Sequence, residues 1–182
     1  AGTKGSAQGY GGNTAVGSGA TATSQDSTAI GKSSLASGAK SIAAGVNARA
    51  TGLSSSAYGD SSYSPYNYST AIGASSSTGA QGATSLGYKA KANGSNSVAL
   101  GSNSVASETN TVSVGSAGNE RRIVNVADAT NDHDAVNKSQ LDDVAEAANN
   151  GTAKATRYFQ ANSTDPDAQA IGTDSVAIGP NA

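Results

Sequence analysis

Apolar and small residues recur along residues 14–114 in phase with a glycine every 14 residues. The ladder has no insertion or deletion, and the residue before each glycine is mostly large and apolar, preceded in turn by Ala or Ser. Its glycines are Gly17, Gly31, Gly45, Gly59, Gly73, Gly87, Gly101 and Gly115. A fixed period held over so many residues is typical of a solenoid, in which each repeat forms one coil.

The rows beside the glycines predict two short strands in each coil. Counted from the glycine, positions −3 and −1 share one face of a strand and position −2 takes the other. Both faces are apolar, so this strand should be buried on both sides. Positions +3 and +5 are small, while +4 varies from Thr21 to Arg49, which predicts a second strand with one wet face. The glycine marks one turn, and a second turn should lie near +7, where Gly38, Gly52 and Gly94 occur.

The doubly buried strand predicts an assembly of several chains. A coil of two strands cannot cover the second apolar face within one chain, and soluble monomers avoid a continuous apolar stripe. We expect the −2 row to face the +3 and +5 rows inside the roll and the −1 row to meet copies of the same chain. The reverse assignment of the two faces also satisfies the pattern. The apolar −1 row includes Val16, Ile30, Ile72, Leu86, Leu100 and Val114.

Composition limits the classes of protein that fit this pattern. The chain has 182 residues, 23 of them Gly, with one Phe and no Trp, Met or Cys. So much Ser and Gly would by itself suggest disorder, but stacking of similar units can supply order. The net charge of −2 without a basic block argues against nucleic-acid binding. No apolar run is long enough to span a membrane, and no signal peptide is recognisable.

The charge pattern changes near Gly118. The first 119 residues carry 9 charges, whereas residues 120–160 carry 12. Ile123, Val124 and Val126 predict a short strand-like piece after this change.

A helix should follow this piece, with Asp132 or Asp134 as its N-cap. Its apolar positions alternate in spacing between three and four residues, which is a short heptad seam of a coiled coil. The seam consists of Leu141, Val144, Ala148, Gly151, Ala155 and Tyr158. The helix could end at Asn149–Gly151.

The 14-residue (S/T)-x-A-(I/V/L)-G repeats followed by ERRIVNVADATNDHDAVNKSQL resemble the head and neck of YadA-like trimeric autotransporter adhesins over residues 1–141. The resemblance implies a mainly β fold, a left-handed parallel β-roll that forms a homotrimer, followed by a neck and a short trimeric coiled coil. It implies a head at 1–117, a neck at 118–141, a short coiled-coil stalk and transition at 142–160 and the start of a second head region at 161–182.

The resemblance also implies that the neck wraps onto adjacent chains and locks the trimer. The residues expected to take part are Arg121, Arg122, Asp128, Asp134 and Leu141. The two arginines and the two aspartates are candidates for ion pairs between subunits, with solvated surface charge as the alternative.

Near the end of the chain the head pattern returns. QAIG at 169–172 and SVAIG at 175–179 repeat the motif after an apolar RYFQAN segment at 157–162. We therefore expect a fragment of a longer fibre, anchored to the bacterial outer membrane through a C-terminal region outside it, with no membrane contact of its own.

No residue pattern predicts an enzyme, a cofactor or a metal site. His133 is the only histidine and lies between Asp132 and Asp134, but adjacent residues rarely ligate one ion together, so a polar neck loop is the simpler interpretation. No G-x-S-x-G nucleophile elbow occurs, and the glycines follow the 14-residue period and not a phosphate-binding motif.

Tyrosines crowd the fourth coil, where Tyr63, Tyr66 and Tyr68 form a candidate ligand-contact patch. Tyrosine suits interfaces because it buries a large area and keeps a polar tip. The alternative is packing between coils or across the trimer, which Tyr58 at position −1 favours.

The resemblance implies attachment to host extracellular-matrix proteins or cell-surface receptors, often with autoaggregation. One alternative is an ice-binding solenoid, but the threonines of the −3 row are interrupted by residues such as Ile42 and Val98. A purely structural β-solenoid spacer is a second alternative. A hexapeptide-repeat acyltransferase does not fit, because the period is 14 and His133 lies outside the repeat.

Overall fold

The computed structural model describes residues 5–8 and 11–156, which form two units that divide between Arg122 and Ile123. The predictions made for Tyr158 and for residues 157–182 lie outside the described residues.

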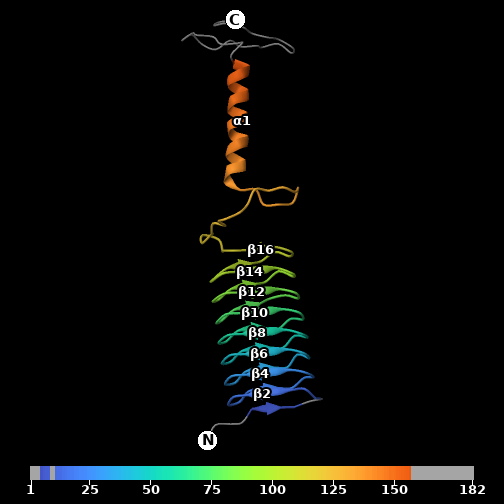
Figure 1. Ribbon diagram of the computed structural model, residues 1–182. Coiled ribbons are helices and arrows are strands. Elements are labelled where there is room, and N and C mark those ends of the chain that lie inside the picture. The colour runs from blue at the N-terminus through green and yellow to red at the C-terminus, as the bar shows by residue number, and fades with distance from the viewer. Residues whose placement is uncertain (1–4, 9–10, 157–182) are drawn as a thin grey trace, which may run out of the picture. The chain divides into compact units, whose positions relative to one another are not determined.

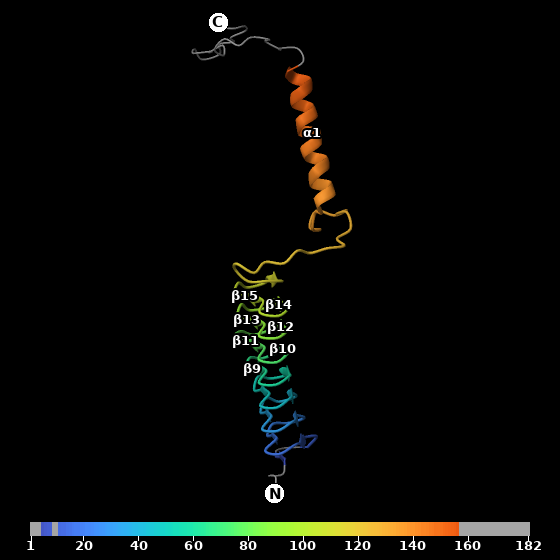
Figure 2. The ribbon, with the colours of Figure 1, turned by 90° about the vertical axis from the view of Figure 1, so that its left-hand side faces the viewer.

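The first unit is a solenoid built from two parallel sheets (Figures 1 and 2). Among the described residues each sheet has eight strands, and Figure 2 shows the two sheets side by side. Sheet A consists of β1 (Ser6–Ala7), β3 (Thr21–Ala22), β5 (Leu35–Ala36), β7 (Arg49–Ala50), β9 (Tyr63–Ser64), β11 (Ser77–Thr78), β13 (Lys91–Ala92) and β15 (Val105–Ala106). Sheet B consists of β2 (Thr14–Val16), β4 (Thr28–Ile30), β6 (Ile42–Ala44), β8 (Ser56–Tyr58), β10 (Thr70–Ile72), β12 (Thr84–Leu86), β14 (Val98–Leu100) and β16 (Val112–Ser113).

Equivalent residues of successive coils stack directly on one another. In sheet B, Ala29 pairs with Ala43 and Ile30 with Ala44, a shift of one 14-residue repeat. The same shift holds in sheet A, where Ala36 pairs with Ala50. The uninterrupted period of the sequence therefore becomes columns of like residues, and the predicted β-solenoid is confirmed.

Each coil turns twice, and the two turns use glycine differently. The ladder glycines from Gly17 to Gly101 have positive φ, for example +124° at Gly73. A Cβ on Gly73 would lie 2.5 Å from the carbonyl oxygen of Gly87 in the next coil, so this position also requires close backbone approach. Gly38 is not in the left-handed region, but a Cβ there would overlap the Gly52 carbonyl. The predicted second turn is thus present, and its glycines are explained by close approach alone.

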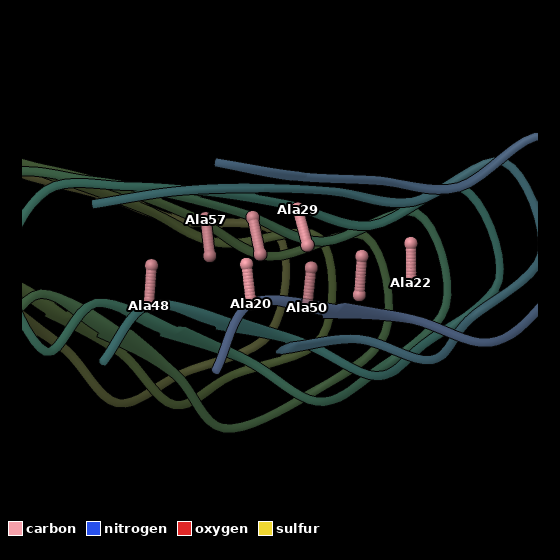
Figure 3. Packing of buried hydrophobic residues seen from close by; sticks show 8 residues of the cluster. Ala20, Ala22, Ala29, Ala48, Ala50 and Ala57 are labelled. Carbon is pink, nitrogen blue, oxygen red and sulfur yellow. The ribbon is translucent and has the colours of Figure 1, made fainter. Parts of the chain in front are cut away.

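The interior of the roll contains Ala and Ser in place of large side chains (Figure 3). Ala29 and Ala57 of sheet B point toward Ala20, Ala48 and Ala50 from the opposite side. The prediction that the −2 row faces the +3 and +5 rows inside the roll is confirmed, because these side chains are fully buried.

Several buried serines close the turns that precede them. Ser62 Oγ donates to the carbonyl of Gly59 at 2.9 Å, and Ser76 Oγ donates to Gly73 at 2.8 Å. Ser97 does the same at the second turn, with Gly94 as the acceptor at 2.7 Å. A buried hydroxyl needs such a partner, so these serines are compatible with the core because they stabilise the turns.

The second unit begins with a segment in which the predicted strand is absent. Residues 123–126 form no strand within the described chain, and Asn125 adopts a φ of 60° that breaks an extended conformation. Helix α1 then runs over Lys138–Thr156.

Both predicted ends of the helix are also wrong. Asn137, and neither Asp132 nor Asp134, is the N-cap, since its Oδ1 accepts from the backbone N–H of Gln140 at 3.2 Å. The helix continues past Asn149–Gly151 to Thr156, so the glycine there does not terminate it.

The glycine ladder gives a stability prediction. We expect Gly73→Ala to lower the free energy of unfolding by about 2–4 kcal/mol, because the new Cβ meets the Gly87 carbonyl at a positive φ. Ser75→Gly, two residues away at a φ of 57°, should change it by less than about 1 kcal/mol. Thermal unfolding by circular dichroism at one fixed protein concentration compares them, and equal midpoints would contradict the explanation.

Candidate functional site

The outer face of sheet B is an apolar stripe that runs along the roll. Most side chains of its −1 row are large and more than a third exposed, including Ile72 at 39% and Leu86 at 41%. The stripe consists of Val16, Ile30, Tyr58, Ile72, Leu86 and Leu100, interrupted by Ala44. Val114, predicted to belong to it, lies just beyond the end of β16 and is half-buried. The expectation that the −1 row faces outward is therefore met in a single chain.

The outer face of sheet A is different, because Leu35 and Val105 of its +4 column flank a stretch of polar, charged and aromatic residues. Arg49, Tyr63, Ser77 and Lys91 follow one another on adjacent strands. The guanidinium of Arg49 lies 5.9 Å from the centroid of the Tyr63 ring, a cation–π geometry.

Tyr66 and Tyr68 lie beside this column on the second turn, and both are exposed. Tyr68 has a φ of 58° and is 56% exposed. A bulky residue in the left-handed region costs about 1–2 kcal/mol, and Asn, Ser, Lys, Asp or Gly fills the equivalent turn positions of the other coils. An exposed aromatic ring at a costly backbone position is a candidate contact residue. Tyr63, Tyr66 and Tyr68 thus follow one another from sheet A into the second turn of the same coil.

The C-terminal end of the roll departs from the repeat. In the regular coils the N–H at position +4 donates to the +3 carbonyl of the next coil, as Arg49 does to Ser62 at 2.9 Å. Val105 instead donates to the carbonyl of Gly115 at 2.8 Å, because the chain leaves the regular coil path three residues before the usual +3 acceptor. A bridge between Ser116 and Asn119 then closes a tight loop.

Arg121 covers the last complete coil. Its guanidinium donates to the carbonyls of Ser102 and Val114. In the preceding coils, the carbonyl equivalent to that of Ser102 accepts a hydrogen bond from a backbone N–H of the next coil. The Lys32 carbonyl, for example, accepts from the Asn47 N–H. A Cβ on Gly101 would meet the guanidinium, whereas a Cβ on Gly87 would meet Gly101. Arg121 therefore takes the place of the next coil, and it satisfies groups that an open solenoid end would leave unpaired.

A pocket of about 510 Å³ opens beside this cap. It is lined by apolar residues of the last coil, including Val105, Val112 and Val114, and by the charged side chains of Glu120 and Arg121.

The neck segment of the second unit is held by amide and carboxylate side chains. Asn137 Nδ2 donates to Asp128 Oδ1 at 2.7 Å and to the Val126 carbonyl at 3.1 Å. Gln140 pairs with both backbone groups of Ala129, accepting at 2.9 Å and donating at 3.1 Å. The first turn of α1 thus fixes the preceding loop.

Asp134 organises a smaller turn inside the neck. Its Oδ2 accepts from the backbone N–H groups of Thr130 and Asn131, both at 3.0 Å. These hydrogen bonds, led by the one from Thr130, hold the pKa of Asp134 below its ordinary value of 3.8. The ionised carboxylate therefore keeps these N–H donors down to a pH below the ordinary pKa of an aspartate.

The other neck residues named from the sequence are exposed in the single chain. Arg122 is exposed, and Leu141 is exposed on α1 beside Val144. Within the described residues the ion pair found joins Lys138 Nζ and Asp142 at 2.6 Å. Ion pairing of Arg121, Arg122, Asp128 and Asp134 between subunits stays a prediction.

Two further observations concern chemistry in the described part of the chain. It contains no group of three or more His, Cys, Asp or Glu side chains arranged to hold a metal ion. It also contains no helix that is long and apolar enough to cross a membrane.

Sequence reasoning missed the capping role of Arg121 and the roles of Asn137 and Gln140. Asn137 and Gln140 stand at the spacing of a capping pair just before the apolar seam, and this spacing could have identified the helix start. No signal marks Arg121, because its role depends on where the chain leaves the roll.

The cap predicts a local effect of Arg121→Ala. Its loss should lower the free energy of local opening in residues 98–113 by about 1 kcal/mol, because two carbonyls lose a charged donor. Amide hydrogen exchange in these residues should become faster. Arg122→Ala is the matched control and should leave exchange there unchanged. The cap is refuted if the two variants exchange alike.

Asp134 predicts a pH dependence in the neck. Its pKa is lowered by folding, so its contribution is complete well above the unfolded value, declines as pH falls below 3.8 and is lost once the pH passes the folded pKa. Amide NMR shifts of Thr130 and Asn131 should report this acid transition, and Asp134→Asn should abolish it. A midpoint at or above 3.8 in the native chain would contradict the assignment.

The comparisons with known proteins cover both units. The YadA head domain repeat matches residues 14–34, 36–62, 67–90, 79–104, 92–117 and 166–182. The coiled stalk of trimeric autotransporter adhesin matches residues 122–164.

Two relatives show the same likeness. The autotransporter adhesin EhaG of Escherichia coli O157:H7 is 46% identical over 68 residues, which are 37% of this chain and only 4% of EhaG. The crystal structure of the collagen-binding domain of the Yersinia adhesin YadA is 31% identical, with a TM-score of 0.60, over 74% of this chain and 83% of that domain. Since the head repeat matches more than half of the residues and the fold is the same, the chain belongs to the YadA-like family of trimeric autotransporter adhesins.

Proposed function

We propose that this chain forms the head segment of a bacterial surface adhesin, in which three copies assemble and attach the cell to host cells or extracellular-matrix proteins. Contacts between heads of neighbouring cells would add autoaggregation. The observation that carries the proposal is the contrast between the two outer faces of the roll. Sheet B presents a long apolar stripe, whereas sheet A presents exposed polar, charged and tyrosine side chains.

The apolar stripe supports assembly into a trimer. Side chains such as Ile72, Leu86 and Leu100 would expose a row of apolar surface in a lone chain, and burying it between copies removes it from water. The family is defined by trimers and supplies the number three. The neck residues Arg121, Arg122, Asp128, Asp134 and Leu141 would add contacts between chains.

The relatives support the location and the kind of activity. EhaG is an autotransporter adhesin, and the matched YadA domain binds collagen. We place this chain at the bacterial surface, anchored to the outer membrane through a region C-terminal to the described residues. The head-repeat family and its fold are non-enzymatic, and we propose binding as the only role of the roll.

Tyr63, Tyr66 and Tyr68 are the proposed contact patch. Tyr63 stands on the outer face of sheet A, and Tyr66 and Tyr68 follow it on the second turn of the same coil. All three are exposed, and Tyr68 keeps its exposed ring despite an unfavourable φ. The ice-binding alternative finds less support, because Ile42, Val98 and Val112 interrupt the threonine column.

A binding screen tests the function. The purified 182-residue protein should bind at least one of collagen, fibronectin, laminin or cultured epithelial cells, and Tyr63→Ala, Tyr66→Ala and Tyr68→Ala should each weaken that binding by about 5-fold or more. Tyr88→Ala, which removes an exposed tyrosine from the opposite turn, is the matched control. Absence of binding to every surface would contradict the adhesin assignment, and an equal loss in the Tyr88 variant would contradict the patch.

A further inference from the structure

We propose that the outer face of sheet A binds an acidic polysaccharide, with Tyr63 as a stacking platform between Arg49 and Lys91. The inference rests on the proposed adhesin function and names the class of ligand that this face recognises. It starts from the +4 column, where Arg49, Tyr63, Ser77 and Lys91 stand on four successive strands of the same sheet.

The first step is the charge of this face. The whole chain has a net charge of −2, but the acidic residues of the roll lie elsewhere. In the described coils no Asp or Glu occupies a +4 or +6 position, and Asp26, Asp60 and Glu108 belong to the turns. Arg49 and Lys91 are exposed on sheet A, whereas Lys89, like these acidic residues, belongs to a turn. A face with cations and without acids is complementary to a polyanion.

The second step is the spacing. Neighbouring strands lie about 4.8 Å apart. Arg49 therefore stands one strand spacing from Tyr63 on one side, and Lys91 stands two strand spacings from Tyr63 on the other side. Ser77, the neighbour of Tyr63 on the Lys91 side, is small, and Gly79 lies on the same coil. An extended chain can therefore lie along the column, over the ring, and reach a cation at each end.

The third step is the chemistry of the three side chains. Arg49 stacks on Tyr63 at 5.9 Å, and a stacked guanidinium still offers N–H donors that match sulfate or carboxylate oxygens. The apolar C–H face of a sugar ring packs on an aromatic ring, and the tyrosine hydroxyl can hydrogen-bond to sugar hydroxyls. Sugar hydroxyls and acidic groups together match this set of side chains, whereas a neutral glycan would leave both cations unused.

Heparin is the probe for the test, with neutral dextran as the control ligand. The purified protein should bind heparin and not dextran, with an affinity that falls as salt rises. Arg49→Ala and Lys91→Ala should each weaken heparin binding about 3-fold and reduce the slope of log affinity against log salt by about one unit. Tyr63→Ala should weaken binding with the slope unchanged, and Tyr63→Phe should retain most of the affinity.

Lys32→Ala and Lys40→Ala remove cations from the two turns and are the matched controls. Binding of heparin no tighter than dextran would overturn the inference, and so would an equal loss in the control variants, because it would indicate diffuse charge. If the protein binds matrix proteins or cells but not heparin, the inference fails and the proposed function stands. If heparin binds but no matrix protein or cell does, the inference is supported and the proposed function fails.

Discussion

The small interior of the roll is the constraint on which the rest of the structure depends. Two sheets approach so closely that only Ala, Ser and Thr fit between them, and the largest fully buried side chains are serines. An alanine core removes little apolar area from water per residue, while each ordered residue costs about 1–2 kcal/mol of backbone entropy. The coils must therefore gain stability from regular backbone hydrogen bonding and from surface that becomes buried when chains associate.

This constraint connects the periodic sequence to the two ends and two faces of the roll. Because like residues stack at a fixed shift, each coil is a template for the next one, and an insertion would break the ladder. A template without a neighbour has unpaired backbone groups, and Arg121 satisfies them at the C-terminal end. Most of the large apolar residues that the interior cannot hold stand on the outer face of sheet B, and we propose the outer face of sheet A for ligands.

The periodic part of the fold was predictable because it depends on local rules. The ladder glycines, the buried −2 row and the exposed −1 row follow from strand alternation and a 14-residue period, and the structure agrees at Gly73, Ala29 and Leu86. The non-periodic part was not predictable in the same way. Ile123–Val126 reads as a strand, but a strand needs a partner, and the chain at Asn125 turns away from an extended conformation. Asp134 is a reasonable cap by residue type, yet its carboxylate is already used by Thr130 and Asn131.

The candidate site shows the same division. The exposed tyrosines were visible in the sequence, but the stacking of Arg49 on Tyr63 emerges only when residues 14 apart become neighbours. The unfavourable φ of Tyr68 likewise leaves no trace in the amino-acid sequence.

Sedimentation of the intact chain tests the central claim most directly, since the thin core makes association part of folding. The native protein should sediment as three chains at micromolar concentration. Leu86→Asp, which places a charge in the stripe on sheet B, should dissociate or unfold it, whereas Ser77→Asp on the outer face of sheet A should remain trimeric. A stably folded monomer of the native chain, or equal behaviour of the two variants, would contradict the account.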